Sequence, residues 1–179
     1  MKKVLLFLDY AASQEEEVVT YHARNIVLAC HIDALYLSEL VARSRVGGNF
    51  LLSNYAIMPA NNDAVLNIAQ IIKTVMRLAE EAEIGAMFIN SQKTVPQRMT
   101  LVEMGHLQPI TPIQTDNSAV HAVVINNVQP RRTKAMDMRF HLLRCRDAQG
   151  QFRYYWRPGT ENLGDYWEKH HPGAHQKIM

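Results

Sequence analysis

The order of the apolar patterns along the chain constrains its fold most strongly. Three segments with the alternating, β-branched-rich pattern of strands, 25–37, 47–54 and 64–73, follow one another before the first long helical pattern begins. Consecutive strands joined by short connections favour antiparallel pairing. We therefore expect the chain to begin its sheet with three antiparallel strands, with Gly47 and Gly48 in or near the first turn.

Helices and strands alternate in the second half of the chain. Strands that are separated by helices pair in parallel through crossovers, so the predicted fold is α/β: a mixed five-stranded sheet, three antiparallel strands followed by parallel ones, with helices on both faces. Pro96 is expected to bend or restart the first of these helices, and Gly105 to end it. The expected elements are a helix at 74–105, a strand at 111–116, helices at 117–127 and 133–150, a strand at 151–159 and a helix at 162–172.

Four acidic residues stand out: for each one alone a structural role is the better explanation, but for all four together it is not. Asp116, at the end of a strand, could cap the next helix, and Asp165 could interact favourably with the helix that it opens. Asp33 lies inside an apolar strand, where a carboxylate is costly unless it is paired or metal-bound. Glu83 interrupts an apolar helix face. Because their elements can converge at one edge of the sheet, the four acids together predict a metal site.

Three glutamates in "LAEEAEIGAMF" compete for the helical position of this site. Glu80 and Glu83 are three residues apart and share a face, whereas Glu81 and Glu83 are about 200° apart around the axis. Glu83 borders the apolar stripe that should pack on the sheet. We therefore predict that Glu83 is the ligand and that Glu81 projects toward solvent.

The segment 131–157 carries most of the positive charge of the protein. It holds eight arginines and lysines against two aspartates, a formal charge of +6 in a chain whose net charge is +2. Such a block suggests contact with a polyanion, although taken alone it is explained better by a solvated helix face. No apolar run approaches the ~18 residues of a membrane span, so no membrane contact is expected. Cys30 and Cys145 lie far apart in apolar segments. This favours two buried free thiols in a reducing compartment over a disulfide between them.

Five motifs in the same order carry a family resemblance. They are "HIDALYLSE", "EEAEIGA", "QTDNSAV", "RRTKAMDMRFHLLR" and "ENLGDYWEKH", and the last three are the most specific. Over about residues 25–172 the chain resembles the ribonuclease H domain of a copia-type LTR retrotransposon polyprotein. The resemblance implies the ribonuclease H-like fold, with residues 1–24 as a tether-like segment that joins the reverse transcriptase, and residues 25–179 as the domain.

The resemblance also implies a reaction and its residues. Asp33, Glu83, Asp116 and Asp165 would be both the catalytic residues and the ligands of two Mg²⁺ ions, for which Mn²⁺ can substitute. The implied activity is hydrolysis of the RNA strand of an RNA–DNA hybrid during reverse transcription.

Further expectations concern partners and location. The implied partners are the hybrid and the reverse transcriptase domain of the parent polyprotein, and the implied location is intracellular, in the cytoplasm, the retrotransposon particle or the nucleus. The residues expected to bind nucleic acid are Asn117, Lys134, Arg139, Arg144 and Arg157.

The chain also departs from its relatives. Glu80 stands where cellular ribonucleases H typically have a neutral amide, and Gly164 stands where the family usually has alanine, which should slightly weaken the start of the last helix. Two alternatives therefore stay open. One is a weak or inactive remnant that binds nucleic acid or serves a structural role. The other is a different nuclease of the same fold, such as an integrase-like or resolvase-like enzyme.

Overall fold

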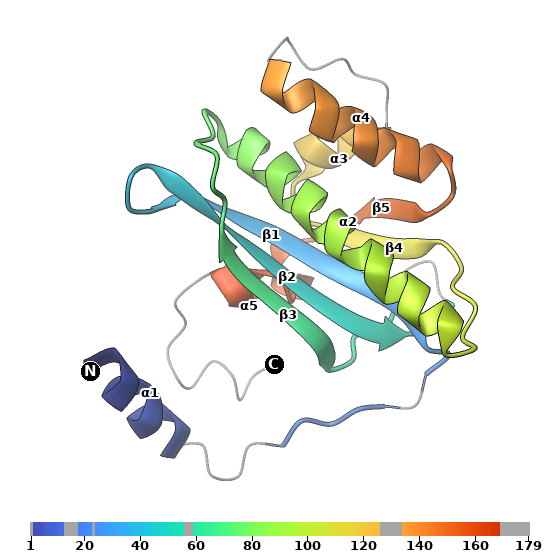
Figure 1. Cartoon of the computed structure of the whole chain (residues 1–179), viewed down its shortest axis with the longest axis horizontal. Helices are drawn as coiled ribbons and strands as arrows, with labels where there is room; N and C mark the ends of the chain where they lie inside the picture. Colours follow the sequence, from blue (N-terminus) through green and yellow to red (C-terminus); the bar gives the residue numbers. More distant parts are fainter. Residues whose placement is uncertain (1, 13–17, 23, 56–58, 126–133, 169–179) are drawn as a thin grey trace.

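A computed structural model describes the chain apart from residues 1, 13–17, 23, 56–58, 126–133 and 169–179 (Figure 1). Its sheet has five strands in the order β3-β2-β1-β4-β5. The strands are β1 (Val27–Glu39), β2 (Arg43–Ser53), β3 (Ala64–Ile71), β4 (Thr111–Thr115) and β5 (Phe152–Trp156). The helices are α1 (Lys2–Ala12), α2 (Ala79–Glu103), α3 (Ser118–Ile125), α4 (Lys134–Ala148), a 3₁₀ turn (Gly159–Glu161) and α5 (Asp165–Glu168).

The pairing of the strands confirms the predicted topology. β1 pairs with β2 and β2 with β3 in antiparallel fashion, whereas β4 joins β1 and β5 joins β4 in parallel. The antiparallel hairpins are local, and the parallel additions use α2 and then α3 and α4 as crossovers. The sheet is therefore a mixed one, and its two parallel neighbours β1 and β4 end at the same edge.

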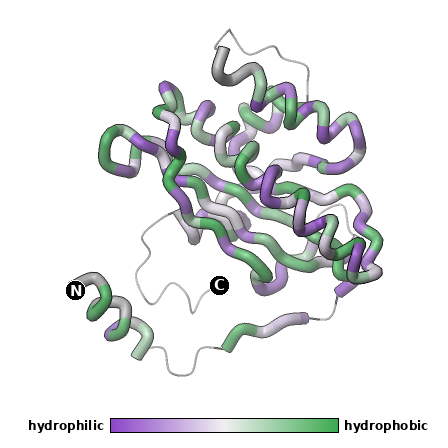
Figure 2. The backbone as a smooth tube through the Cα atoms, viewed as in Figure 1, coloured by the Kyte–Doolittle hydropathy of each residue, from purple (hydrophilic) through white to green (hydrophobic). Residues whose placement is uncertain are grey.

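The apolar core lies between one face of the sheet and the helices α2, α3 and α4 (Figure 1). Even-numbered residues of β1 point into it, and α2 contributes Ile84 and Met87 while α4 contributes Phe140 and Leu143. Figure 2 shows hydrophobic and hydrophilic positions mixed along α2, α3 and α4, which accords with one side of each packing on the sheet. Among the described residues, no helix combines the length and apolar character that crossing a membrane requires.

The opposite face of the sheet carries a polar row across all five strands. The registers place Asn67, Asn49, His31, Gln114 and Tyr155 side by side, from β3 to β5. All but Asn67 are buried. The short helix α5 packs on this face against β1 and β2, so helices cover both faces as predicted.

The predicted position of the first turn was wrong. Gly47 and Gly48 lie within β2, opposite Asp33 and Ile32 of β1. The chain reverses between β1 and β2, where Val41 has a positive φ of 61° although it is not glycine. Glycine signals both a turn and a close approach of another element, and the second applies here: a Cβ on Gly48 would collide with a side chain of α2.

The predicted ends of the helices were partly right. Gly105 and Gly150 follow α2 and α4 with φ values of 91° and 65°, as helix-ending glycines do. The helix α2 begins at Ala79 and not at residue 74, because Leu78 is extended. Pro96 lies inside this single continuous helix and does not restart it. Pro172, the predicted end of the last helix, is outside the described residues.

Candidate metal centre

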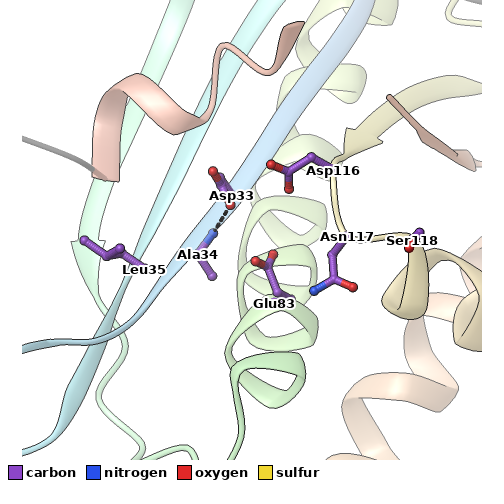
Figure 3. A pocket seen from close by; sticks show the side chains of 7 residues that line it. All are labelled: Asp33, Ala34, Leu35, Glu83, Asp116, Asn117 and Ser118. Carbon is purple, nitrogen blue, oxygen red and sulfur yellow. Dashed lines mark hydrogen bonds between the residues drawn. The ribbon is translucent and has the colours of Figure 1, made fainter. Parts of the chain in front are cut away.

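Three carboxylates meet at the edge of the sheet where β1 and β4 approach α2. Each of Asp33, Glu83 and Asp116 offers an oxygen, and these oxygens all lie within 4.8 Å of one another. Asp33 is 4% exposed and Glu83 is 9% exposed, whereas Asp116 is half-buried. Figure 3 shows the three carboxylates pointing toward a common space. The structure therefore brings together three of the four acids that the sequence singled out.

The register of the parallel strands explains why the two aspartates meet. His31 of β1 lies opposite Gln114 of β4, so residues two positions further on, Asp33 and Asp116, reach the same edge on the same face. Glu83 comes from the first turns of α2, which packs on β1. The site thus depends on strand register and on the axial position of one helix.

Asn117, not Asp116, caps the helix that follows β4. Its Oδ1 accepts the backbone N–H of Val120 at 3.0 Å, which satisfies one of the free donors at the start of α3. The alternative role for Asp116 is therefore filled by its neighbour, and the Asp116 carboxylate points into the cavity. That cavity has a volume of about 400 Å³ and is lined by Asp33, Ala34, Leu35, Glu83, Asp116, Asn117 and Ser118.

The end of β5 and the residues that follow it also contact Asp116. The indole N–H of Trp156 donates to the Asp116 carbonyl at 2.8 Å. A Cβ on Gly159 would lie 2.7 Å from Asp116 Oδ2, so any other residue there would require the carboxylate to move. Neither Trp156 nor Gly159 was predicted as part of the site, because neither carries chemistry of its own that would mark it in the sequence.

A cluster of this kind suits a divalent cation. Asp33 Oδ1 accepts the backbone N–H of Ala34 at 2.8 Å, which holds this carboxylate in place (Figure 3). Three ionised carboxylates at such spacing repel one another, and nearly buried charges of one sign need compensation. Carboxylate oxygens are the donors that Mg²⁺ prefers in proteins. The donor set therefore fits magnesium or manganese.

Asp165 does not belong to the cluster of three carboxylates within 4.8 Å. It opens α5 and follows a loop that is fixed on β1 right beside Asp33. Asn162 Nδ2 donates to the Ile32 carbonyl at 2.8 Å, and the Leu163 N–H donates to His31 Nδ1 at 3.2 Å. The loop thus keeps Asp165 at the start of a helix next to the site, and its role as a ligand stays a prediction.

Comparison with solved structures identifies the architecture. The chain superposes on LC11-RNase H1, isolated from compost by a metagenomic approach, with a TM-score of 0.58 and 10% identity over 79% of this chain and 92% of that one. The N-terminal RNase H domain of rv2228c from Mycobacterium tuberculosis gives 0.55 and 11% identity over 80% and 91%. The domain has a ribonuclease H-like fold. LC11-RNase H1 in complex with an RNA/DNA hybrid gives 0.55 and 8% identity over 78% and 92%. No protein-family model matches the sequence, and neither does any curated protein.

The basic residues of this ribonuclease H-like domain differ in the contacts that they make within the protein. Arg139 Nη2 donates to Thr74 Oγ1 at 3.2 Å, and its guanidinium lies 5.8 Å from the centre of the Phe88 ring. Arg144 lies over the Phe140 ring at 5.4 Å and stays half-buried.

Two further basic residues complete the predicted set. Arg157 forms an ion pair with Glu161. Lys134 begins α4, but its side chain lies outside what the structure describes.

The three competing glutamates of α2 have different surroundings. Glu83 belongs to the carboxylate cluster, as predicted, and Glu80 is exposed. Glu81 was expected to project toward solvent, but it is half-buried and its Oε2 accepts the Arg77 N–H at 2.8 Å. It thus binds the backbone just before the helix, where a negative charge also interacts favourably with the helix dipole.

We expect Gly164→Ala to destabilise the ribonuclease H-like domain. Helix propensity alone would favour alanine by about 1 kcal/mol. However, a Cβ at this position would lie 2.9 Å from the Ile32 carbonyl carbon and 3.0 Å from the His31 carbonyl oxygen, and backbone cannot give way cheaply. Thermal unfolding should show a lower Tm for Gly164→Ala, while an unchanged or higher Tm would mean that the loop does not lie this close to β1.

The buried His31 predicts an acid-sensitive contribution to stability. Burial and, secondarily, the charge of Arg157 lower the pKa of His31 from 6.5 to about 3. Between these pH values the unfolded chain binds a proton that the folded chain does not, so this contribution is present above pH 6.5 and is lost as the pH falls toward 3.

A comparison with His31→Asn isolates this effect. The asparagine oxygen can still accept the Leu163 N–H, and both proteins carry the same carboxylates, so their titration cancels in the difference. The free energy of unfolding of the unaltered protein, measured in denaturant at several pH values, should fall relative to that of the variant below about pH 6.5. A difference that is constant with pH would show that His31 is not held neutral.

Proposed function

We propose that this domain is a ribonuclease H that hydrolyses the RNA strand of RNA–DNA hybrids, with two Mg²⁺ ions held by Asp33, Glu83, Asp116 and Asp165. The observation that carries the proposal is the cluster of three carboxylates within 4.8 Å at the strand edge of a ribonuclease H-like fold. A protein of similar fold has been described in complex with an RNA/DNA hybrid.

Some residues of this chain would bind the metal ions, and others would bind the nucleic acid. Two divalent ions, when bound, supply charge neutralisation at the attacking and leaving oxygens of a phosphodiester, and Mn²⁺ can replace Mg²⁺ in this role. Asp33 and Glu83 are nearly buried, so their carboxylates are held in fixed positions. Asn117 and Ser118 also line the cavity, and their side chains would contact a phosphate group of a substrate bound there.

Affinity for the hybrid would come from basic side chains of α4 and of the segment after β5. Arg144 on α4 and Arg157 after β5 are candidates for phosphate contacts, which give affinity without sequence preference. Lys134, Arg139 and Asn117 complete the proposed nucleic-acid-binding set. Preference for RNA would arise from contacts with 2′-hydroxyls in the minor groove of the hybrid.

We further propose that the domain serves reverse transcription as a module of a copia-type retrotransposon polyprotein. The order of the five motifs supports it, and residues 1–24 would then lead from the reverse transcriptase domain, its partner in the polyprotein. Tyr21 hydroxyl donates to the Ala64 carbonyl at 3.0 Å, so the end of this segment contacts the domain.

An intracellular location in the cytoplasm, the retrotransposon particle or the nucleus belongs to the same proposal. It accords with free cysteines at Cys30 and Cys145, of which Cys145 proves exposed and not buried within an apolar segment.

We predict that Glu83→Gln abolishes cleavage of a labelled RNA–DNA hybrid without changing the fold, because it removes one negative ligand from the cluster. Glu81→Gln is the matched control: the same chemical change two residues away should leave the rate nearly unchanged and lower stability only slightly, since Glu81 binds backbone at the helix start. Cleavage should require Mg²⁺ or Mn²⁺ and stop in EDTA. Ca²⁺, with its looser coordination, should bind without supporting turnover.

The same assay on duplex DNA and duplex RNA separates the alternatives. Cleavage of duplex DNA in preference to the hybrid would indicate a different nuclease of this fold. Binding of the hybrid without cleavage, under all metal conditions, would indicate a remnant that binds nucleic acid. Equal loss of activity in Glu81→Gln and Glu83→Gln, or full activity in EDTA, would contradict the proposed site.

We predict that Arg144→Gln weakens hybrid binding and makes it less sensitive to salt. A lost phosphate contact should reduce the slope of log affinity against log salt by about one. Arg139 was expected to behave alike, and both arginines lie over an aromatic ring, but Arg139 also donates to Thr74, so replacing it removes a hydrogen bond within the protein as well and Arg144 gives the cleaner test.

Lys93→Gln on the exposed part of α2 removes the same charge away from the basic block and controls for net charge. If Arg144→Gln and Lys93→Gln give the same salt slope, the basic block is only a solvated face.

A further inference from the structure

The face of α2 that packs on the sheet contains polar side chains where apolar ones would serve packing better. Asn90, Ser91 and Thr94 are each at most 1% exposed. Burying polar groups is costly unless they form specific hydrogen bonds, so their presence calls for a structural reason. Thr94 satisfies its hydroxyl within the helix, on the Asn90 carbonyl at 2.8 Å. Asn90 and Ser91 instead reach the sheet.

Asn90 binds β2 at very close range. Its Nδ2 donates to the Gly47 carbonyl at 3.1 Å and to the Ala86 carbonyl of its own helix at 3.0 Å. A Cβ on Gly48 would lie 2.0 Å from Asn90 Oδ1 and 2.9 Å from its Cγ. The amide therefore occupies the space that any side chain at position 48 would take, and α2 approaches the sheet more closely than another residue there would allow.

This contact joins the helix that carries Glu83 to the strand next to that of Asp33. Asn90 follows Glu83 by seven residues, about two turns, so both side chains project from the same side of α2. Gly47, which accepts the hydrogen bond, is the register partner of Asp33 in the neighbouring strand. The hydrogen bond thus ties the helix that carries Glu83 to the residue paired with Asp33.

An apolar contact would not fix the position of α2 along its axis in the same way. A helix that slips along a smooth apolar surface by one turn moves about 5.4 Å. That displacement exceeds the 4.8 Å within which the three carboxylate oxygens lie, so a slip of one turn would take Glu83 out of the cluster. A buried hydrogen bond is lost on slipping and leaves unpaired polar groups, which selects one axial position.

We propose that Asn90 is a positioning residue that sets the spacing between Glu83 and Asp33, with Gly48 as the gap that admits it. The inference rests on the proposed metal-dependent function. It concerns how the ligands are placed and assigns no contact between Asn90 and metal or substrate.

Ser91 provides a matched control on the same helix. It is equally buried and exchanges a hydrogen bond of 3.1 Å with the Tyr154 hydroxyl on β5. Tyr154 points to the core face and lies three strands away from β2, on the other side of β1. Ser91→Ala therefore removes a buried contact between helix and sheet without loosening the link to Gly47.

The test compares Asn90→Ala with Ser91→Ala in three measurements. Both variants should lower Tm to a similar extent. Only Asn90→Ala should weaken Mn²⁺ binding, measured by calorimetry without substrate, by on the order of tenfold, as for other changes to groups that orient metal ligands. Only Asn90→Ala should lower kcat on a hybrid, with KM unchanged, because the nucleic-acid contacts are intact.

Gly48→Ala separates positioning from packing. Alone, its methyl collides with Asn90 and should push α2 away, weakening Mn²⁺ binding. In the double variant with Asn90→Ala the methyl fills the vacated space, so Tm should recover above that of Asn90→Ala while Mn²⁺ affinity stays low. If Asn90→Ala does not fold, the double variant carries the test.

Two results would overturn the inference. One is Mn²⁺ affinity and kcat in Asn90→Ala or the double variant equal to those of the unaltered protein. The other is an equal loss of Mn²⁺ affinity in Ser91→Ala, which would reduce Asn90 to a general packing role. Failure of the unaltered protein itself to bind Mn²⁺ would instead overturn the proposed function, and the two failures are thereby distinguished.

Discussion

Mutual repulsion of three carboxylates is the constraint on which the rest of this structure depends. At a separation of 4.8 Å and an effective dielectric constant of about 20, each ionised pair repels by about 3 kcal/mol. That free energy is a substantial part of the stability of a domain of this size. It must be offset by the surrounding structure or by a bound cation. The fold therefore has to hold the carboxylates together from elements that are each fixed independently.

The sheet and the helix α2 share this task. Parallel pairing of β1 with β4 brings Asp33 and Asp116 to one edge, and the first turns of α2 add Glu83. The side of the sheet opposite α2 is stabilised differently. A loop covers the polar row there, and its Asn162 donates to the carbonyl of Ile32, the residue before Asp33. Both faces of the sheet therefore carry polar contacts beside the site, in addition to the apolar core.

The sequence predicted much of this arrangement, and the limits of the prediction have physical causes. Strand and helix periods marked the five strands and the crossovers, and a carboxylate inside an apolar strand marked Asp33, because such a residue has few structural explanations. Gly47 and Gly48 were misplaced, since glycine signals a turn and a close approach alike. The roles of Asn90 and Trp156 could not be read, because they depend on contacts between segments far apart in sequence.

The position of a bound divalent cation tests the proposed site most directly. Crystals of the protein grown with Mn²⁺ allow the metal to be located by its anomalous scattering, independently of any activity. The account predicts anomalous density among the carboxylates of Asp33, Glu83 and Asp116, reinforced when a hybrid is bound. Density at another position, or none at this cluster at millimolar Mn²⁺, would contradict it.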